Sequence, residues 1–272
     1  MRIPHASIDL AHVFADISTN LLISLATAGS MLLLALTTEK CVPHARRPSW
    51  EHAWFNIRYT VVLLGIIAGF RPFLLAFPLM FTRALDVGYI TFAPGALGWL
   101  CAFLAVLVMT DLLEYLFHRA QHTFSVLWRM HELHHSAEHY DVTLSYRHFW
   151  FEPLLKMTLL YPLVGVVFNV PATVGMAVGT VFLVNHHVAH MNWRFSPRRF
   201  SLLVSHSQYH RLHHSRNECD YNKNFCDLLP LWDILFGTLR QPARDEFVDV
   251  GLGSGAAPHN LMQALLWPWR RN

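Results

Sequence analysis

The chain carries little charge for its length. Only 14% of its 272 residues are Asp, Glu, Lys or Arg, whereas 53% are hydrophobic. That balance excludes an ordinary soluble domain. The formal net charge of +3 is mild, and no basic stripe with interleaved aromatic residues is present, which argues against a nucleic-acid partner. We therefore expect an integral membrane protein.

Cysteine is also scarce. The four cysteines include no C-x-x-C pair, so the sequence predicts free thiols in a reducing compartment; they are Cys41, Cys101, Cys219 and Cys226. The N-terminus lacks a basic segment followed by a small-residue cleavage site. We therefore interpret the first apolar run as a retained helix and not as a signal peptide.

Long apolar runs predict the fold class. Residues 17–38 carry no charge and reach roughly 33 Å as a helix, enough for one crossing. A second run, 59–82, is interrupted only by Arg71 and Pro72, so it can span if kinked. Together with the two runs that follow, they indicate an all-α, polytopic membrane helical bundle.

The third and fourth runs contain helix breakers. The third, 87–110, includes a Pro-Gly pair ending at Gly95, after which we expect its helix to begin. The fourth, 157–185, has an Asn-Val-Pro sequence near its middle that ends at Pro171. It is predicted to be a membrane hairpin of two short helices, whose arms need polar extensions or only partial insertion.

Basic residues predict the orientation. Four of them lie between the first two spans: Lys40, Arg46, Arg47 and Arg58. The next connection holds Arg83 and Asp86, so the first loop is expected to be cytoplasmic. Because the hairpin returns the chain to that side, we expect a multi-pass protein whose candidate functional site lies in a cytoplasmic, His-rich helical cap.

The chain shows no low-complexity linker, and we expect three regions. Residues 1–110 form N-terminal transmembrane helices, and residues 111–240 form a His-rich unit that includes the hairpin. Residues 241–272 form a C-terminal interfacial tail. The motifs NWRFSPRRF and LLWPWRRN mix Trp and Phe with Arg, as interfacial anchors do.

Histidine is the residue present in excess, with 19 copies against 18 of Asp and Glu together. Four motifs, HRAQH, HELHH, NHHVAH and HRLHH, space histidines at i, i+3 or i+4, which places their rings on one helix face. Ten such ligands exceed the need of one zinc ion but fit two metal ions with four or five nitrogens each. Imidazole suits several metals, so spacing alone does not name the ion. The candidate ligands are His118, His122, His131, His134, His135, His186, His190, His210, His213 and His214.

The other histidines fall into two classes. His187 can replace His186 as a ligand, and His139, His148 and His206 can line the site or hydrogen bond ligands. The remaining ones have no clustered partner and are interpreted as packing or interfacial residues; they are His5, His12, His44, His52 and His259.

Three carboxylates lie near the histidine motifs in the sequence. Asp111 and Glu114 lie two turns and one turn before His118, where we expect them to hydrogen bond the second ring nitrogen of a ligand. Glu132 and His135 form an E-x-x-H pair, but the equivalent position in HRLHH is Arg211, so a histidine-dominated site is favoured.

From Asp111 to about Leu239 the ordered motifs resemble the fatty acid hydroxylase and sterol desaturase superfamily of integral-membrane di-iron enzymes. They are DLLEYLFHRAQH, LWRMHELHHS, HRLHHS and NKNFCDLLPLWDILFGT, with the middle histidines between them. The resemblance implies two Fe ions on the ten histidines, with Zn as a possible substitute in purified protein. It also implies that Asn224, Trp232-Asp233 and residues 236–238 brace the histidine helices.

The resemblance further implies O2 as co-substrate and an external electron donor, such as a ferredoxin, cytochrome or reductase. The expected reaction is hydroxylation of an unactivated C–H bond in a membrane lipid, whether fatty acyl, sterol-like or a related lipid. Desaturation at the same site is the alternative. A His-rich metal transporter is an alternative of another class, but it predicts ligands distributed along a crossing. A zinc hydrolase is disfavoured because HELHH is one residue short of H-E-x-x-H.

Overall fold

The computed structural model describes residues 10–41, 50–85, 87–193, 200–243, 246–252 and 257–270. Five residues named in the sequence analysis lie outside them: His5, His44, Arg46, Arg47 and Asp86. Residues 194–199 of the predicted anchor NWRFSPRRF also lie outside. The described part is mostly helical and contains only two isolated β-bridges in place of strands. All four cysteines are free, as predicted. The elements, in chain order, are α1 (Leu10–Cys41), α2 (Trp50–Leu85), α3 (Ala96–Thr123), α4 (Ser125–His135), η1 (Val142–Tyr146), α5 (Phe151–Leu155), the π-helical η2 (Lys156–Leu160), α6 (Tyr161–Val167), α7 (Ala172–His190), α8 (Ser207–His213), η4 (Glu218–Asp220), α9 (Leu231–Leu235), α10 (Leu261–Leu265) and η5 (Trp267–Trp269).

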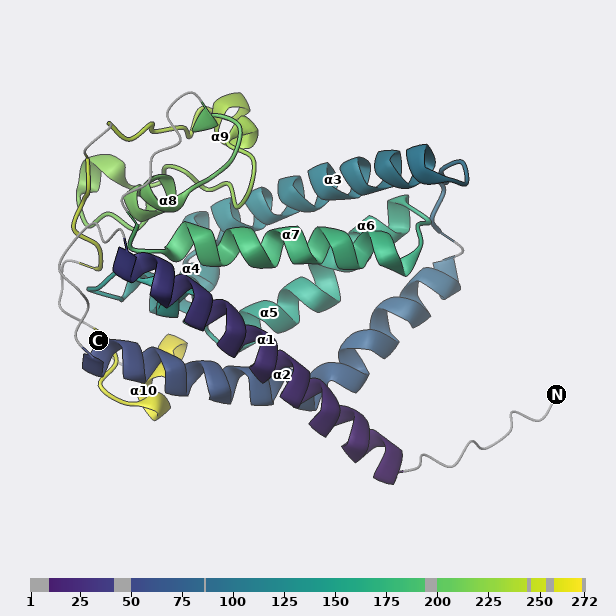
Figure 1. Cartoon of the computed structure of the whole chain (residues 1–272), viewed down its shortest axis with the longest axis horizontal. Coiled ribbons are helices and arrows are strands. Elements are labelled where there is room, and N and C mark those ends of the chain that lie inside the picture. Colours follow the sequence, from purple (N-terminus) through teal and green to yellow (C-terminus); the bar gives the residue numbers. More distant parts are fainter. Residues whose placement is uncertain are drawn as a thin grey trace.

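Four of these helices are long and apolar enough to cross a membrane: Ala15–Cys41, Trp50–Leu74, Ala96–Thr123 and Ala172–His190. They confirm the predicted all-α membrane bundle. As expected, α3 begins directly after Gly95, whose φ of 100° ends the preceding loop. It then runs past residue 110 to Thr123, so one helix joins the spanning region to the first histidine motif (Figure 1).

At the predicted break, α6 and α7 are joined by a turn at residues 168–171. Gly88 N and Ile90 N donate to Val166 O at 2.9 Å and Val167 O at 3.0 Å, which ties the α2–α3 connection to this turn. Both lie at the end of the bundle away from α4 and α8, the helices of the His-rich cap (Figure 1). Only the second arm, α7, is a candidate span, because its helix continues beyond residue 185 to His190.

Close packing holds α3 beside α7 (Figure 1). Ala102 and Val106 of α3 are buried against Val174 and Val178 of α7, each pair spaced by four residues on one helix face. Small side chains let two membrane helices approach closely. Leu97, on another face of α3, is 75% exposed, as expected for a lipid-facing residue. This packing brings the histidine-bearing ends of both helices to the same end of the bundle.

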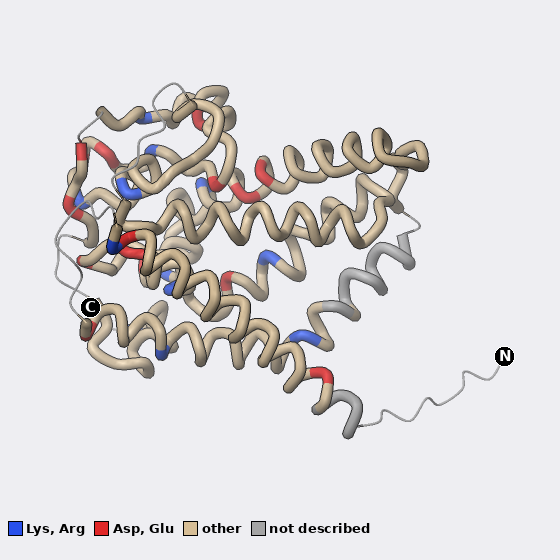
Figure 2. Tube along the Cα trace, viewed as in Figure 1, with Lys and Arg blue, Asp and Glu red and all other residues tan. Residues whose placement is uncertain are grey.

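Charged residues gather at the cap end, whereas the opposite half of the described bundle has few (Figure 2). The carboxylate of Glu39, near the end of α1, accepts hydrogen bonds from Val142 N at 2.9 Å and Asn192 N at 2.7 Å. These bonds fasten α1 to the cap. The end of α1 that carries Lys40 is therefore on the same side as the cap.

The C-terminal segment packs onto the cap helices. Trp267 is buried, and its indole Nε1 donates to the Glu132 carboxylate at 3.0 Å. Arg270 donates to the same carboxylate at 2.9 Å. Trp267 is thus a core residue and not the interfacial anchor expected from LLWPWRRN, because Glu132 satisfies its polar edge inside the protein. Trp269 remains 65% exposed.

Candidate metal centre

The structure brings nine of the ten predicted histidines together in two groups at the cap end. In each group, one nitrogen from every ring lies within 4.8 Å of the others. The five-histidine group contains His118, His122, His131, His135 and His213. The four-histidine group contains His134, His190, His210 and His214.

Each H-x-x-H-H motif serves both groups. On α4, His131 and His135 enter the five-histidine group, whereas His134 enters the four-histidine group. In HRLHH the assignment is reversed: the first and last histidines join the four-histidine group, and His213 joins the other. Residues i and i+4 lie about 40° apart around a helix, whereas i+3 and i+4 lie about 100° apart. One helical turn can therefore face two centres.

The spacing of the ring nitrogens fits a metal ion in each group. The Nε2 atoms of His118 and His131 are 3.1 Å apart. The Nε2 atom of His190 lies 3.1 Å from the Nε2 atoms of both His134 and His210. With metal–nitrogen bonds of about 2.0–2.1 Å, nitrogens around one ion lie about 2.9 Å apart in octahedral and about 3.4 Å apart in tetrahedral geometry. The observed separations fall between these values.

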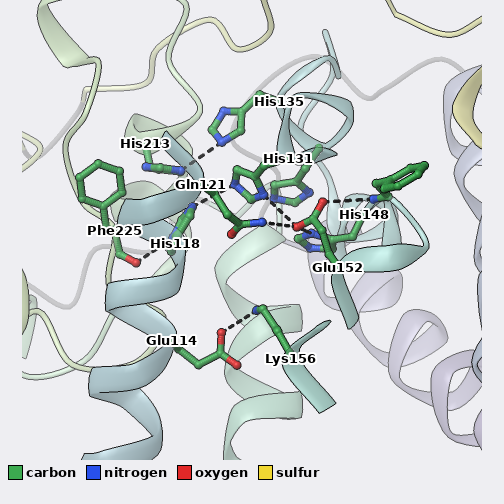
Figure 3. A network of polar contacts seen from close by, with 12 residues as sticks. Glu114, His118, Gln121, His131, His135, His148, Glu152, Lys156, His213 and Phe225 are labelled. Atoms are coloured by element: carbon green, nitrogen blue, oxygen red, sulfur yellow. Dashed lines mark hydrogen bonds and ion pairs between the residues drawn. The ribbon is translucent and has the colours of Figure 1, made fainter. Parts of the chain in front are cut away.

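Backbone carbonyls fix the ring orientation in the five-histidine group. The Nδ1 of His118 donates to Phe225 O at 2.8 Å (Figure 3), and the Nδ1 of His213 donates to Lys223 O at 2.8 Å. A carbonyl oxygen can only accept, so Nδ1 carries the proton in both rings. The Nε2 lone pair of each ring is therefore free to bind a metal ion.

Burial keeps these rings neutral. The pKa values of His134, His135 and His210 lie well below the usual value. Burial is the main cause, and repulsion from the neighbouring imidazoles is the second. Burial lowers the pKa of His213 to about 4. The Nε2 of His122 is buried with no hydrogen-bond partner in the protein. Neutral imidazoles with converging lone pairs are what a cation requires.

His186 is the one predicted ligand that neither group includes. Its Nε2 donates to Ser145 O at 2.6 Å, and its backbone carbonyl accepts from His190 Nδ1 at 2.7 Å. The alternative, His187, also lies outside both groups, with Nδ1 donating to Leu183 O at 2.7 Å. His186 thus orients His190 in this arrangement.

The carboxylate beside a candidate ligand is Glu152, which the sequence analysis missed. Its Oε2 lies 3.2 Å from His131 Nδ1 and accepts from Gln121 Nε2 at 2.5 Å (Figure 3). The Nδ1 of His148, whose ring stacks on that of His134, is 3.5 Å away. Burial by itself raises the pKa of Glu152, but His131 and His148 hold it below the usual range. The available signal was a lone carboxylate in an otherwise apolar segment.

Asp111 and Glu114 do not contact the histidines in the hydrogen bonds of the described residues, which corrects the expectation for both. Glu114 instead pairs with Lys156 Nζ at 2.5 Å (Figure 3), and it accepts from Tyr161 OH at 2.6 Å. Asp111 precedes His118 by seven residues, about 10 Å along the helix axis. Its carboxylate is too far away and bonds a neighbouring loop.

That loop is the segment that supplies the two carbonyls. Asp111 accepts from Leu228 N and Trp232 Nε1, both at 2.9 Å. Asp233 is completely buried and accepts from Phe225 N at 2.9 Å. The two aspartates hold the loop on both sides of the point where Phe225 O meets a histidine. Their effect on the site is therefore indirect, through the backbone.

Asn224 completes the brace. It has a φ of 58°, in the left-handed region that Asn tolerates better than most residues. Its side chain accepts from Arg240 N at 2.7 Å and donates to Tyr209 O at 3.2 Å. Because Tyr209 belongs to α8, these contacts connect the loop to a histidine helix, as the resemblance implied for Asn224 and Trp232-Asp233.

Replacing Glu152 with alanine is expected to weaken metal binding to the five-histidine group about 10–100-fold. The change removes the acceptor of His131 Nδ1 and leaves the buried Gln121 amide without its partner. Metal retention against a competing chelator measures the effect. The matched control is Glu132→Gln, because Glu132 contacts Trp267 and Arg270 instead of a histidine. Equal retention in both variants would contradict the assignment.

Comparisons with known proteins agree on one family. The family described as fatty acid hydroxylase matches residues 103–238. The ornithine lipid hydroxylase of Rhizobium tropici is 31% identical over 64% of this chain and 52% of its own length. The alkylglycerol monooxygenases of Danio rerio and Homo sapiens are 30% and 29% identical, each over 57% of this chain and 33% of its own length. The chain thus spans about half the length of the ornithine lipid hydroxylase and about a third of the length of the alkylglycerol monooxygenases. No solved structure matches.

Proposed function

Because this chain belongs to the fatty acid hydroxylase family, we propose that it is a membrane lipid hydroxylase that uses O2 and external electrons. The main support is the pair of buried histidine groups at one end of four apolar helices. The relatives named for hydroxylation of ornithine lipid and monooxygenation of alkylglycerol support a lipid substrate. Histidines collected at one end of the bundle do not fit a transport path, which needs ligands along a crossing.

The proposed reaction is R–H + O2 + 2 e− + 2 H+ → R–OH + H2O. Two iron ions held by the nine grouped histidines would supply the oxidising power, since an unactivated C–H bond offers no group for acid–base attack. The chain contributes orientation: the carbonyls of Lys223 and Phe225 and the carboxylate of Glu152 each fix one imidazole. The buried setting of the rings limits access of water.

The proposal includes the side of the membrane. The cap shares its side with Lys40 and with the start of α2, which carries Arg58. An excess of basic residues favours the cytoplasm. Electrons would then reach the cap from a cytoplasmic ferredoxin, cytochrome or reductase. Residues 111–240 form the catalytic unit in this proposal, and residues 1–110 supply membrane helices.

The test is anaerobic reconstitution of the detergent-purified chain with iron-57, followed by metal analysis and Mössbauer spectroscopy. We expect about two irons per chain, with spin coupling after oxidation, given the two groups. The same protein is then given a chemical reductant, 18O2 and a total lipid extract. A lipid that gains one labelled oxygen supports hydroxylation.

Two controls make the result decisive. Zinc-loaded protein keeps the fold and the ligands but has no redox chemistry, so it should yield no labelled lipid. A lipid that loses two hydrogens without gaining oxygen would show desaturation instead. Reduced, iron-loaded protein that changes no lipid in either way would refute the proposal.

A further inference from the structure

A cleft of about 450 Å³ lies outside the two histidine groups, between α7 and the segment 200–206. Val181 and Val184 line it from α7, and Phe200 and Val204 line it from the facing segment. Leu228 contributes a further apolar side chain. The volume is within the range of about 300–1,000 Å³ typical of ligand sites. Its walls are mainly hydrocarbon.

Two polar side chains in this cleft lack partners. His206 is only 3% exposed, and neither of its ring nitrogens has a hydrogen-bond partner in the protein. The Oγ of Ser205 is also buried without one. Both residues line the cleft. Buried polar groups almost always have a hydrogen-bond partner. The two ring nitrogens of His206 and the Oγ of Ser205 therefore indicate that a hydrogen-bonding ligand occupies the cleft.

The cleft lies beside exposed residues of α7, a candidate membrane span. It is lined by Thr180 and Val184, both exposed on the outer face of the spanning helix α7. None of the residues that line the cleft is Asp, Glu, Lys or Arg. These features disfavour a water-soluble or anionic ligand.

We propose that this cleft binds a membrane lipid, with the chain along α7 and an uncharged hydroxyl, ester or amide group on His206 and Ser205. The polar end lies next to the four-histidine group in the chain. Val188, another lining residue, precedes His190 by two positions, and His206 precedes His210 by four. The identification of this lipid as the substrate rests on the proposed function, whereas the binding itself needs neither metal nor turnover.

The test is photolabelling of the full chain in phosphatidylcholine nanodiscs with two diazirine probes. One is a diacylglycerol with the diazirine in one acyl chain, and the other is a hydrocarbon of equal chain length without a polar group. We expect labels on residues 180–188 and 200–206. Val184→Trp, which fills the cleft, should reduce labelling by both probes at least about fivefold.

His206→Leu separates the polar contact from the apolar one. It should reduce diacylglycerol labelling at least about fivefold while changing hydrocarbon labelling less than about twofold. The matched control is Met176→Trp, because Met176 is 72% exposed on α7 and does not line the cleft. That variant should label as the unmodified chain does.

The outcomes are distinct from those of the hydroxylase test. Unchanged labelling in Val184→Trp, or equal loss of both probes in His206→Leu, would overturn the lipid assignment. So would cross-links between two copies of the chain at the cleft after treatment with a bifunctional reagent, which would indicate a second copy as the occupant. Labelling as expected in a protein that oxidises no lipid would refute only the proposed function.

Discussion

Replacing His134 with alanine should lower product formation at least about a hundredfold and reduce the bound metal from about two ions to about one per chain. His134 belongs only to the four-histidine group, where its Nε2 lies 3.1 Å from that of His190. Three histidines remain there, whereas the five-histidine group keeps its full set. The loss should therefore be confined to one metal ion.

The neighbouring His135 provides a contrast. It belongs to the five-histidine group, which keeps four ligands after His135→Ala, so this variant should retain more metal than His134→Ala. Metal analysis after dialysis against a chelator, paired with the lipid oxidation assay, separates the two. His259→Ala is the control, since His259 is exposed and belongs to neither group. A fully active His134→Ala protein with two metal ions would refute the ligand assignment.

Local signals in the sequence were enough to predict the helices and the turns. Gly95 and the turn ending at Pro171 mark where α3 and α7 begin, because glycine and proline act on the backbone of their own segment. The spacing of the histidine motifs likewise predicted shared helix faces. It could not predict that His134 and His213 would each leave their motif neighbours for the other group, since that depends on how α4 and α8 face each other.

The supports of the site were harder to predict than its ligands. Asp111 and Glu114 are near His118 in sequence, but their carboxylates reach other elements instead. Glu152 lies on α5, 21 residues after His131, which lies on α4. The two side chains meet only through tertiary packing. The carbonyl of Phe225 has no side-chain signature at all, because every residue has one. Pattern reasoning detects side chains that recur, whereas these contacts are set by the folded backbone.

Asp233→Ala is expected to destabilise the protein by at least about 3 kcal/mol, because the buried carboxylate satisfies several donors at once. Its oxygens accept from Phe225 N at 2.9 Å, Cys226 N at 2.8 Å, Tyr209 OH at 2.8 Å and Thr238 Oγ1 at 2.6 Å. Alanine leaves all four donors without this partner. The apparent melting temperature in detergent, followed by intrinsic fluorescence, measures the loss.

The same substitution should also weaken metal binding unequally, which a merely structural loss would not do. Freed from Asp233, the loop no longer holds Phe225 O against His118, a member of the five-histidine group. Among the hydrogen bonds of the described residues, none joins the four-histidine group to a carbonyl of this loop, so that group should keep its ion better at temperatures where the fold persists. Asp249→Ala is the matched control: its carboxylate is 75% exposed and pairs with Arg216 at the surface, so its removal should cost at most about 1 kcal/mol. If Asp233→Ala had the same apparent melting temperature as Asp249→Ala and retained both ions equally, the loop would not position the site.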